Sequence, residues 1–259
     1  MLIRRFTPQG PVDRNSDLPL VLIHINKTAG TSFSHVLFDL FEHDEIAPAY
    51  RGDFSAVDIG APGLRLYHGP MRHADWYRNG VPALPICMLR DPEARLVSQY
   101  KSFSDQANAR DAKRWANHQE NEEALELARN GTFDDFVLSE NRLIKGHCNN
   151  LQVQFLSTSG RARSDEDAAT AIKALEEHFF YFGITEAYEQ SLGLLSWQLN
   201  DRDLPQLEAR NISREVPVKA VSAAAKAHVK EYTRLDKKLY KAAKRLFEKR
   251  LKHISQTMS

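Results

Sequence analysis

Residues 20–33, LVLIHINKTAGTSF, place a lysine, a glycine and two hydroxyl side chains directly after a short apolar run. Such a loop between a strand and a helix can hold a phosphate, because backbone N–H groups at a helix N-terminus lack partners and the helix dipole favours an anion. Gly30 allows close approach of the backbone, and Thr31 and Ser32 can donate hydroxyls. In the common nucleotide-binding loop, G-x-x-x-x-G-K-[ST], the lysine follows the last glycine, whereas Lys27 precedes Gly30. The stretch predicts an anion site with a different task for its lysine; the alternative is a simple helix cap beside a surface lysine.

A second stretch with this potential is PICMLRDPEARLVSQYKSF, residues 85–103. An apolar strand runs into Arg90-Asp91-Pro92, and proline is favoured in the first turn of a helix. Arg90 at the strand end and Ser98 two turns along the helix could together hold a second phosphate. The alternative is a structural Arg–Asp pair at the end of the strand.

Histidines near a third apolar run are candidates for a general base. The segment LRLYHGPMRHADWY contains His68 directly after the expected strand, and His73 five residues later. His24 lies within the first apolar run, which predicts a buried core residue.

Together, the first two stretches resemble PAPS-dependent sulfotransferases, in the carbohydrate branch related to heparan sulfate 2-O-sulfotransferase. HINKTAGTS is similar to the 5′-phosphosulfate loop of that branch, H-x-P-K-T-A-G-T-S, and RDPEARLVSQY to its 3′-phosphate motif, R-D-P-x-x-R-x-x-S-x-Y. These two motifs are specific. The resemblance covers residues 18–249 and has weaker support from residues 149–157, 181–195 and 231–249.

The resemblance implies an O-sulfotransferase that uses 3′-phosphoadenosine 5′-phosphosulfate (PAPS), releases 3′-phosphoadenosine 5′-phosphate (PAP) and needs no metal. Lys27 would be catalytic, at the oxygen that bridges phosphate and sulfate, where a fixed charge stabilises the negative charge that develops as the bond breaks. The cofactor-binding residues would be Lys27, Thr28, Gly30, Thr31, Ser32, Arg90 and Ser98. The acceptor would be a hydroxyl, most simply on a carbohydrate, although a tyrosine or small-metabolite hydroxyl is an alternative.

The sequence departs from the family pattern at two positions. Asn26 stands where the family usually has proline, so we expect a looser loop. The branch has Y-H-G-H where this chain has Tyr-His-Gly-Pro, so His68 matches the first histidine while Pro70 replaces the second. We favour His68 as the general base; His73, a nearby carboxylate or a purely structural role for these histidines are the alternatives.

Short apolar runs and helical periodicity indicate the elements that must position these residues. Strands are expected at residues 20–25, 64–68, 86–89 and 179–184, with helices between them. Thr132 with Asp135, and Ser164 with Asp167, predict helix starts. The pattern predicts an α/β fold: one domain at residues 18–253 with a parallel sheet flanked by helices, after a loosely ordered arm at residues 1–17. The family resemblance further implies a P-loop-like sulfotransferase fold.

Composition bounds the function classes. The 259 residues carry a formal net charge of +1, which gives no argument for a nucleic-acid partner, and the basic run at residues 226–252 is expected to be a solvated helix face or a wall beside an anion. The two cysteines indicate a reducing compartment, and no apolar stretch is long enough for a signal peptide or a membrane span. We expect a cytoplasmic protein; the sequence does not predict its oligomeric state.

Two other functions fit parts of the pattern. A P-loop nucleotide or small-molecule kinase would use ICMLRD as a strand that ends in a Mg²⁺-binding aspartate, but the chain lacks the G-K-[ST] order. A non-catalytic nucleotide-binding relative is the other alternative. Further candidate contacts to nucleotide or acceptor are Arg210, Arg214 and Lys219, and residues 107–131 form a polar segment that could shape the acceptor cleft.

Overall fold

The structure is a computed structural model, and it describes most of the chain. The described residues are 2–7, 10–15, 17–48, 60–80, 82–108, 119–200 and 221–257. The candidates Arg210, Arg214 and Lys219 lie outside them, as do residues 109–118 of the polar segment.

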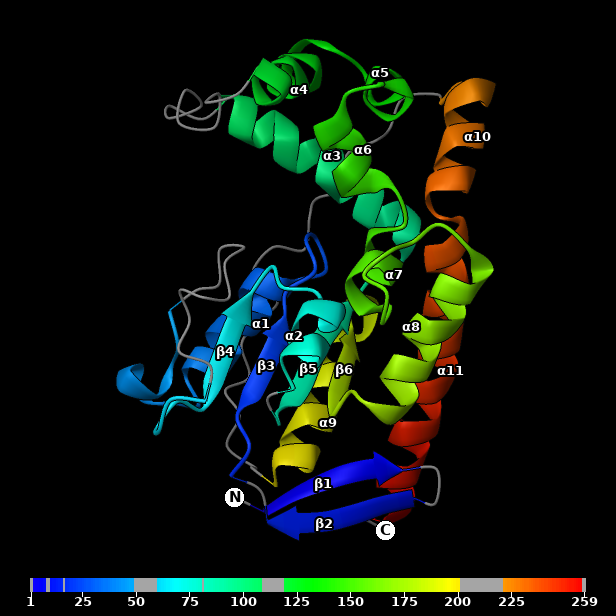
Figure 1. Ribbon diagram of the computed structural model, residues 1–259. Coiled ribbons are helices and arrows are strands. Elements are labelled where there is room, and N and C mark those ends of the chain that lie inside the picture. The colour runs from blue at the N-terminus through cyan, green and yellow to red at the C-terminus, as the bar shows by residue number, and fades with distance from the viewer. Residues whose placement is uncertain are drawn as a thin grey trace.

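A four-stranded parallel sheet forms the centre of the fold (Figure 1). Its strands run in the order β4-β3-β5-β6, and Leu22 of β3 lies opposite His68 of β4 and Ile86 of β5. Almost every strand residue is buried, because helices flank the sheet. The expected α/β fold with a parallel sheet is therefore confirmed. The strands are β3 (Leu20–Ile23), β4 (Leu66–Gly69), β5 (Leu84–Leu89) and β6 (Tyr181–Ile184).

The helices begin largely where the local sequence predicts. Side-chain caps at Thr132 and Ser164 start α5 and α8, each with a reciprocal aspartate three residues on, and Pro92 opens α3. The helices are α1 (Gly30–Phe38), α2 (His73–Asn79), α3 (Pro92–Asn108), α4 (Gln119–Asn130), α5 (Phe133–Leu138), α6 (Arg142–Cys148), α7 (Leu151–Leu156), α8 (Asp165–Glu177), α9 (Tyr188–Leu199), α10 (Ala223–Tyr232) and α11 (Arg234–Thr257), with short 3-10 turns at η1 (His43–Glu45) and η4 (Thr185–Ala187).

The N-terminal residues differ from the expected loosely ordered arm. They form an antiparallel hairpin of β1 (Leu2–Thr7) and β2 (Gly10–Asn15), which lies beside the C-terminal end of α11 (Figure 1). Phe6 stacks on Trp197 of α9, with ring centroids 5.4 Å apart, and the Arg250 guanidinium lies 4.9 Å from the centre of the Phe6 ring. These contacts come from residues about 190 and 240 positions away, so the local sequence did not reveal them.

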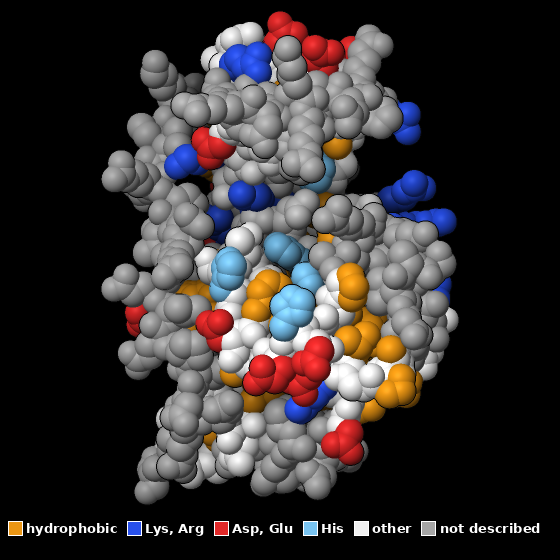
Figure 2. Space-filling model, turned by 90° about the vertical axis from the view of Figure 1, so that its left-hand side faces the viewer, with side chains coloured by type: hydrophobic (Ala, Val, Ile, Leu, Met, Phe, Trp, Pro, Cys, Tyr) orange, Lys and Arg blue, Asp and Glu red, His pale blue; other side chains and the backbone are white. Residues whose placement is uncertain are grey.

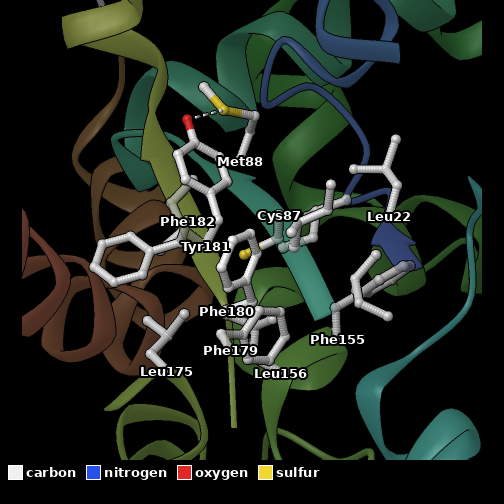
Figure 3. Close-up of a cluster of buried hydrophobic side chains, with 14 of the residues drawn as sticks. Leu22, Cys87, Met88, Phe155, Leu156, Leu175, Phe179, Phe180, Tyr181 and Phe182 are labelled. Carbon is white, nitrogen blue, oxygen red and sulfur yellow. Dashed lines mark hydrogen bonds between the residues drawn. The ribbon is translucent and has the colours of Figure 1, made fainter. Parts of the chain in front are cut away.

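Two separate hydrophobic cores support the fold. The larger core surrounds the sheet, and Figure 3 shows Cys87 of β5 among Phe155, Leu156 and Phe180. Burial raises the pKa of the Cys87 thiol, which suits a core residue. The smaller core lies among the helices α3–α6 and α10, and includes Phe103. In Figure 1 this helical part lies above the sheet, beyond the ends of its strands.

Two helices of the larger core, α7 and α11, cap each other reciprocally through buried polar groups. Asn150 Oδ1 accepts hydrogen bonds from the backbone N–H groups of Leu235 and Asp236, at 2.7 and 3.1 Å, and so caps α11. In return, the Asp236 carboxylate accepts from Gln152 N and Val153 N, at 3.2 and 2.8 Å, and so caps α7. The long basic C-terminal stretch is therefore two helices, divided at Thr233.

A buried arginine links these capped helices to the smaller core. Arg95 of α3 is 1% exposed and donates through Nη2 to the carbonyl oxygens of His147 and Cys148. Burial raises the pKa of Asp236 to about 6, while the nearby Arg95 acts in the opposite direction.

Through the described part of the chain, no helix is both long and apolar enough to cross a membrane.

Candidate functional site

A cavity of about 920 Å³ lies where the carboxyl ends of the parallel strands meet the helical part of the fold. We call its two sides the strand wall, formed by residues that follow β3, β5 and β6, and the helical wall, formed by α3, α4 and α6. In open parallel sheets, ligands bind outside the carboxyl ends of the strands. Figure 2 views the molecule from the side of α1 and β4, where histidine side chains gather in the middle of the face with Lys and Arg side chains above them.

The loop between β3 and α1 has a strained backbone. Lys27 has φ 68° and Ala29 has φ 62°, a left-handed conformation that costs about 1–2 kcal/mol for such residues. The other described non-glycine residues with positive φ are asparagines, which tolerate it. Strain of this kind gathers at ligand sites, and alternating backbone conformations can turn successive N–H groups into one concavity that binds anions.

The N-terminus of α1 opens into the cavity, which Ala29, Gly30, Thr31 and Ser32 line. No side chain caps this helix at Ala29, so the first turn presents its backbone donors there. A Cβ at Gly30 would meet the His24 ring, which would have to move to make room. Thr28 differs from its neighbours: its buried hydroxyl donates to Ile25 O at 2.9 Å, and its side chain is not part of the cavity lining.

Arg90 lines the cavity from the end of β5 and is fixed by neighbouring groups. The buried Gln152 amide bonds both sides of its backbone, accepting from Arg90 N at 3.0 Å and donating to Arg90 O at 2.9 Å. Arg90 Nη1 donates to Lys27 O at 3.2 Å, and Nε lies 3.9 Å from the Glu186 carboxylate. Among the described residues, this buried Nε has no hydrogen-bond partner. The Arg90 backbone is thus fixed, and its guanidinium is a cation on the cavity lining.

Helix α3 brings Ser98 to the same cavity. Asp91 Oδ1 accepts from the backbone N–H groups of Glu93 and Ala94, at 3.0 and 2.9 Å, and so fixes the start of the helix. Gln99, beside Ser98, is 4% exposed and lines the cavity, and its Oε1 has no hydrogen-bond partner among the described residues. Two segments that lie some 60 residues apart thus meet around one space.

Positive charge dominates the strand wall. Lys27 makes no ion pair with any residue that the structure describes, and Arg90 has only the distant Glu186 carboxylate. The pKa of Lys27 is lowered, first by burial and then by Arg90, with Asp105 acting in the opposite direction. A bound anion would relieve this repulsion between two cations.

The three candidate histidines occupy different places. His24 is half-buried just beyond β3 and lines the cavity, so it is not the core residue that its apolar neighbours suggested. His68 is near it on the edge strand β4, where its ring meets Phe38 edge-on at 4.9 Å, and it does not line the cavity. Burial is the main cause that lowers the pKa of both, and His68 is the second cause for His24. Both are therefore neutral near pH 7, as a general base must be.

His73 is packed away from the cavity. It is 1% exposed, and its ring lies 5.3 Å from that of His178 and 5.2 Å from that of Phe179. Burial and the neighbouring His178 lower its pKa to about 4. This environment is that of a neutral core side chain.

Sequence reasoning missed two residues of this site. His147 of α6 lines the cavity and meets Asn26, with 3.3 Å between Asn26 Nδ2 and His147 Nδ1. The side-chain amide of Gln152 fixes the backbone of Arg90 through two hydrogen bonds. Neither role could be predicted from neighbouring residues, because His147 acts on a segment 121 residues away and Gln152 on one 62 residues away. Gln152 does lie in residues 149–157, which gave the family resemblance its weaker support.

Comparisons with known proteins add no assignment. No protein-family model matches the chain, and a search of curated proteins finds no significant relative.

Proposed function

We propose that the protein is a PAPS-dependent O-sulfotransferase with a P-loop-like sulfotransferase fold. One observation carries the proposal: the two segments that resemble the phosphate motifs of that family, residues 24–32 and 90–100, line one cavity at the carboxyl ends of β3 and β5. Lys27, Arg90 and the uncapped N-terminus of α1 together offer the charge and the donors that a doubly phosphorylated nucleotide needs.

In the proposed reaction an acceptor hydroxyl oxygen bonds to sulfur as the bond from sulfur to the bridging phosphate oxygen breaks. The electron pair of that bond remains on the phosphate of PAP, and the hydroxyl proton passes to a base. Lys27 stabilises the charge on the departing oxygen. The backbone N–H groups of Gly30, Thr31 and Ser32 and the hydroxyls of the last two hold the 5′-phosphate. Arg90 and Ser98 hold the 3′-phosphate.

The structure bears on two of the roles that the motifs suggest, the phosphate contact of Thr28 and the choice of general base. The hydroxyl of Thr28 is committed to Ile25 O, so Thr28 contributes to the phosphate site through its backbone. For the base we retain His68, and His24, which lines the cavity, is the direct competitor. A carbohydrate hydroxyl is the proposed acceptor.

The kinase alternative loses support from Asp91. This carboxylate caps α3 and is not part of the cavity lining, whereas a Mg²⁺ ligand in a kinase would face the phosphates.

Transfer itself is the test. We expect the protein, given labelled PAPS and a panel of carbohydrate, tyrosine and small-molecule acceptors, to yield a sulfated product detectable by mass spectrometry, with activity retained in a chelator. Calorimetry should show binding of PAP in preference to Mg·ATP. Preferential ATP binding would move the assignment to a kinase, and PAP binding without transfer to any acceptor would favour a non-catalytic relative.

Lys27→Ala sharpens this test. It should lower the transfer rate by about 10²–10³-fold, because removal of one preorganised donor has an effect of that order, while PAP binding largely survives. Lys173→Ala, an exposed lysine on α8, is the matched control and should leave both unchanged. An unaltered rate in Lys27→Ala would refute the role of Lys27. The transfer rates of His68→Ala and His24→Ala should be measured in parallel. The histidine whose substitution stops turnover is the general base.

A further inference from the structure

The contact between Asn26 and His147 bears on which nitrogen of this histidine carries its proton. The side-chain amide nitrogen of asparagine has hydrogen atoms and no free electron pair, so it can only donate. Asn26 Nδ2 lies 3.3 Å from His147 Nδ1. With the Asn26 amide nitrogen as the donor, Nδ1 is the acceptor in this contact, which corresponds to a neutral ring with its proton on Nε2.

The surroundings keep the ring neutral. Burial lowers the pKa of His147, and the positive charge of Arg95 lowers it further. Arg95 also donates to the carbonyl oxygen of the same residue. The Phe103 ring meets the imidazole edge-on, with ring centroids 5.6 Å apart, and so restricts its plane. A cationic imidazolium is thus disfavoured at this position.

We propose that Asn26 holds His147 as the neutral tautomer protonated on Nε2, so that His147 donates a hydrogen bond to an oxyanion of the ligand bound at Lys27. The ring lines the cavity, and its only hydrogen bond with a described residue uses Nδ1. Nε2 is therefore the nitrogen left for a ligand. The ligand group that accepts this hydrogen bond is a sulfuryl or phosphoryl oxygen, because Lys27 and Arg90 line the same cavity and favour an anion there.

This assignment separates His147 from the general base. A base needs a free electron pair on the nitrogen that meets the acceptor, and Nε2 in this tautomer has none. His147 is then a binding residue and Asn26 a positioning residue that acts through it. Proline, which the resemblance would place at position 26, has no donor to offer. The inference rests on the proposed anion site at Lys27, but the state of the ring can be measured without knowing which anion binds.

The direct test is long-range ¹H–¹⁵N NMR of the histidine side chains in the full-length protein, with the His147 signals identified by their loss in His147→Gln. We expect a protonated Nε2 and an unprotonated Nδ1. Asn26→Leu, which keeps the approximate volume but removes the donor, should release the ring into a mixture of tautomers. A proton on Nδ1 in the unmodified protein, or an unchanged tautomer in Asn26→Leu, would overturn the inference.

Anion binding supplies the second readout, with inorganic sulfate as the probe. Titrated sulfate should shift the His147 Nε2–H resonance, and His147→Ala should weaken sulfate binding about tenfold, the effect expected for a hydrogen bond to a charged group. His147→Gln, whose amide can donate from a similar place, should recover most of this affinity. His35→Gln on α1, outside the cavity, is the matched control. An unshifted resonance, or equal affinities in the alanine variant and the unmodified protein, would refute the donor role.

Failure here and failure of the proposed function look different. If His147 carries the proton on Nε2 and responds to sulfate while no acceptor is sulfated, the oxyanion site stands and the transfer reaction does not. If transfer proceeds while the ring is protonated on Nδ1, the function stands and this inference does not.

Discussion

The strand wall of the cavity and the helical wall are built in different ways. The strand wall holds Lys27 and Arg90 on a loop with two left-handed non-glycine residues. The helical wall is regular helix whose two charged lining residues, Lys101 and Asp105, have opposite signs, and the rest of its polar lining consists of amides, hydroxyls and His147. Each wall rests on its own hydrophobic core. The difference indicates that a bound anion gains its charge interaction from the strand wall and directional hydrogen bonds from the helical wall.

Behind the two walls, the buried contacts of Asp236 with α7 and with Arg95 are the feature whose loss should cost most. Asp236→Ala removes both acceptors that cap α7 and leaves the buried Arg95 without its counter-charge, so unfolding free energy should fall by about 3–5 kcal/mol. Urea unfolding measures this. Asp236→Asn keeps one acceptor oxygen and should cost less, which protects the test if the alanine variant does not fold.

Asp165→Ala is the control for these contacts, because Asp165 is exposed on α8 and pairs only with surface cations. It should leave the unfolding free energy nearly unchanged. Equal losses in Asp236→Ala and Asp165→Ala would show that the two cores do not depend on this buried contact.

Acid should lower the unfolding free energy through His73, which lies in the part of the fold around the sheet. The folded protein keeps His73 neutral down to about pH 4, whereas the unfolded chain takes up the proton near 6.5, the ordinary pKa of a histidine side chain. Stability from this group is complete above pH 6.5 and falls as the pH falls towards 4, by about 3 kcal/mol in total.

Urea unfolding of His73→Phe between pH 7.5 and 4.5 checks this expectation, because the variant should lose most of that dependence. His43→Phe, an exposed histidine in η1, is the control and should keep it. If the slope with pH were the same in both variants, the acid sensitivity would have another origin.

The smallest expected effect comes from a glycine-to-alanine substitution, made once on the strand wall and once on the helical wall. Gly30→Ala forces the His24 ring to move and should cost about 1–3 kcal/mol of stability, together with weaker anion binding at the start of α1. Gly146→Ala in α6 meets no atom and should stabilise the helix by about 0.5–1 kcal/mol. Thermal unfolding and sulfate binding of both variants give the comparison; a neutral Gly30→Ala would contradict the tight packing of the strand wall.

Much of the fold could be predicted because its signals are local. The buried runs that become β3 and β5, the proline that opens α3 and the capping pairs at Thr132 and Ser164 are all contained in a few consecutive residues. The N-terminal hairpin and the division of the C-terminal stretch at Thr233 could not be predicted in this way. The first is held by Trp197 and Arg250, and the second by Asn150, all far away in the sequence.

The candidate site shows the same limit at the level of side chains. The sequence by itself determined that Lys27 and Arg90 follow two apolar strands, and parallel strands bring such residues to one edge of a sheet. Only the tertiary structure decided that the Thr28 hydroxyl points to Ile25, that His24 lines the cavity, that Gln152 fixes Arg90 and that Asn26 meets His147. The physical reason is the range of the interactions: strand order follows from local apolar patterns, whereas the direction of a polar side chain depends on partners that folding brings from elsewhere in the chain.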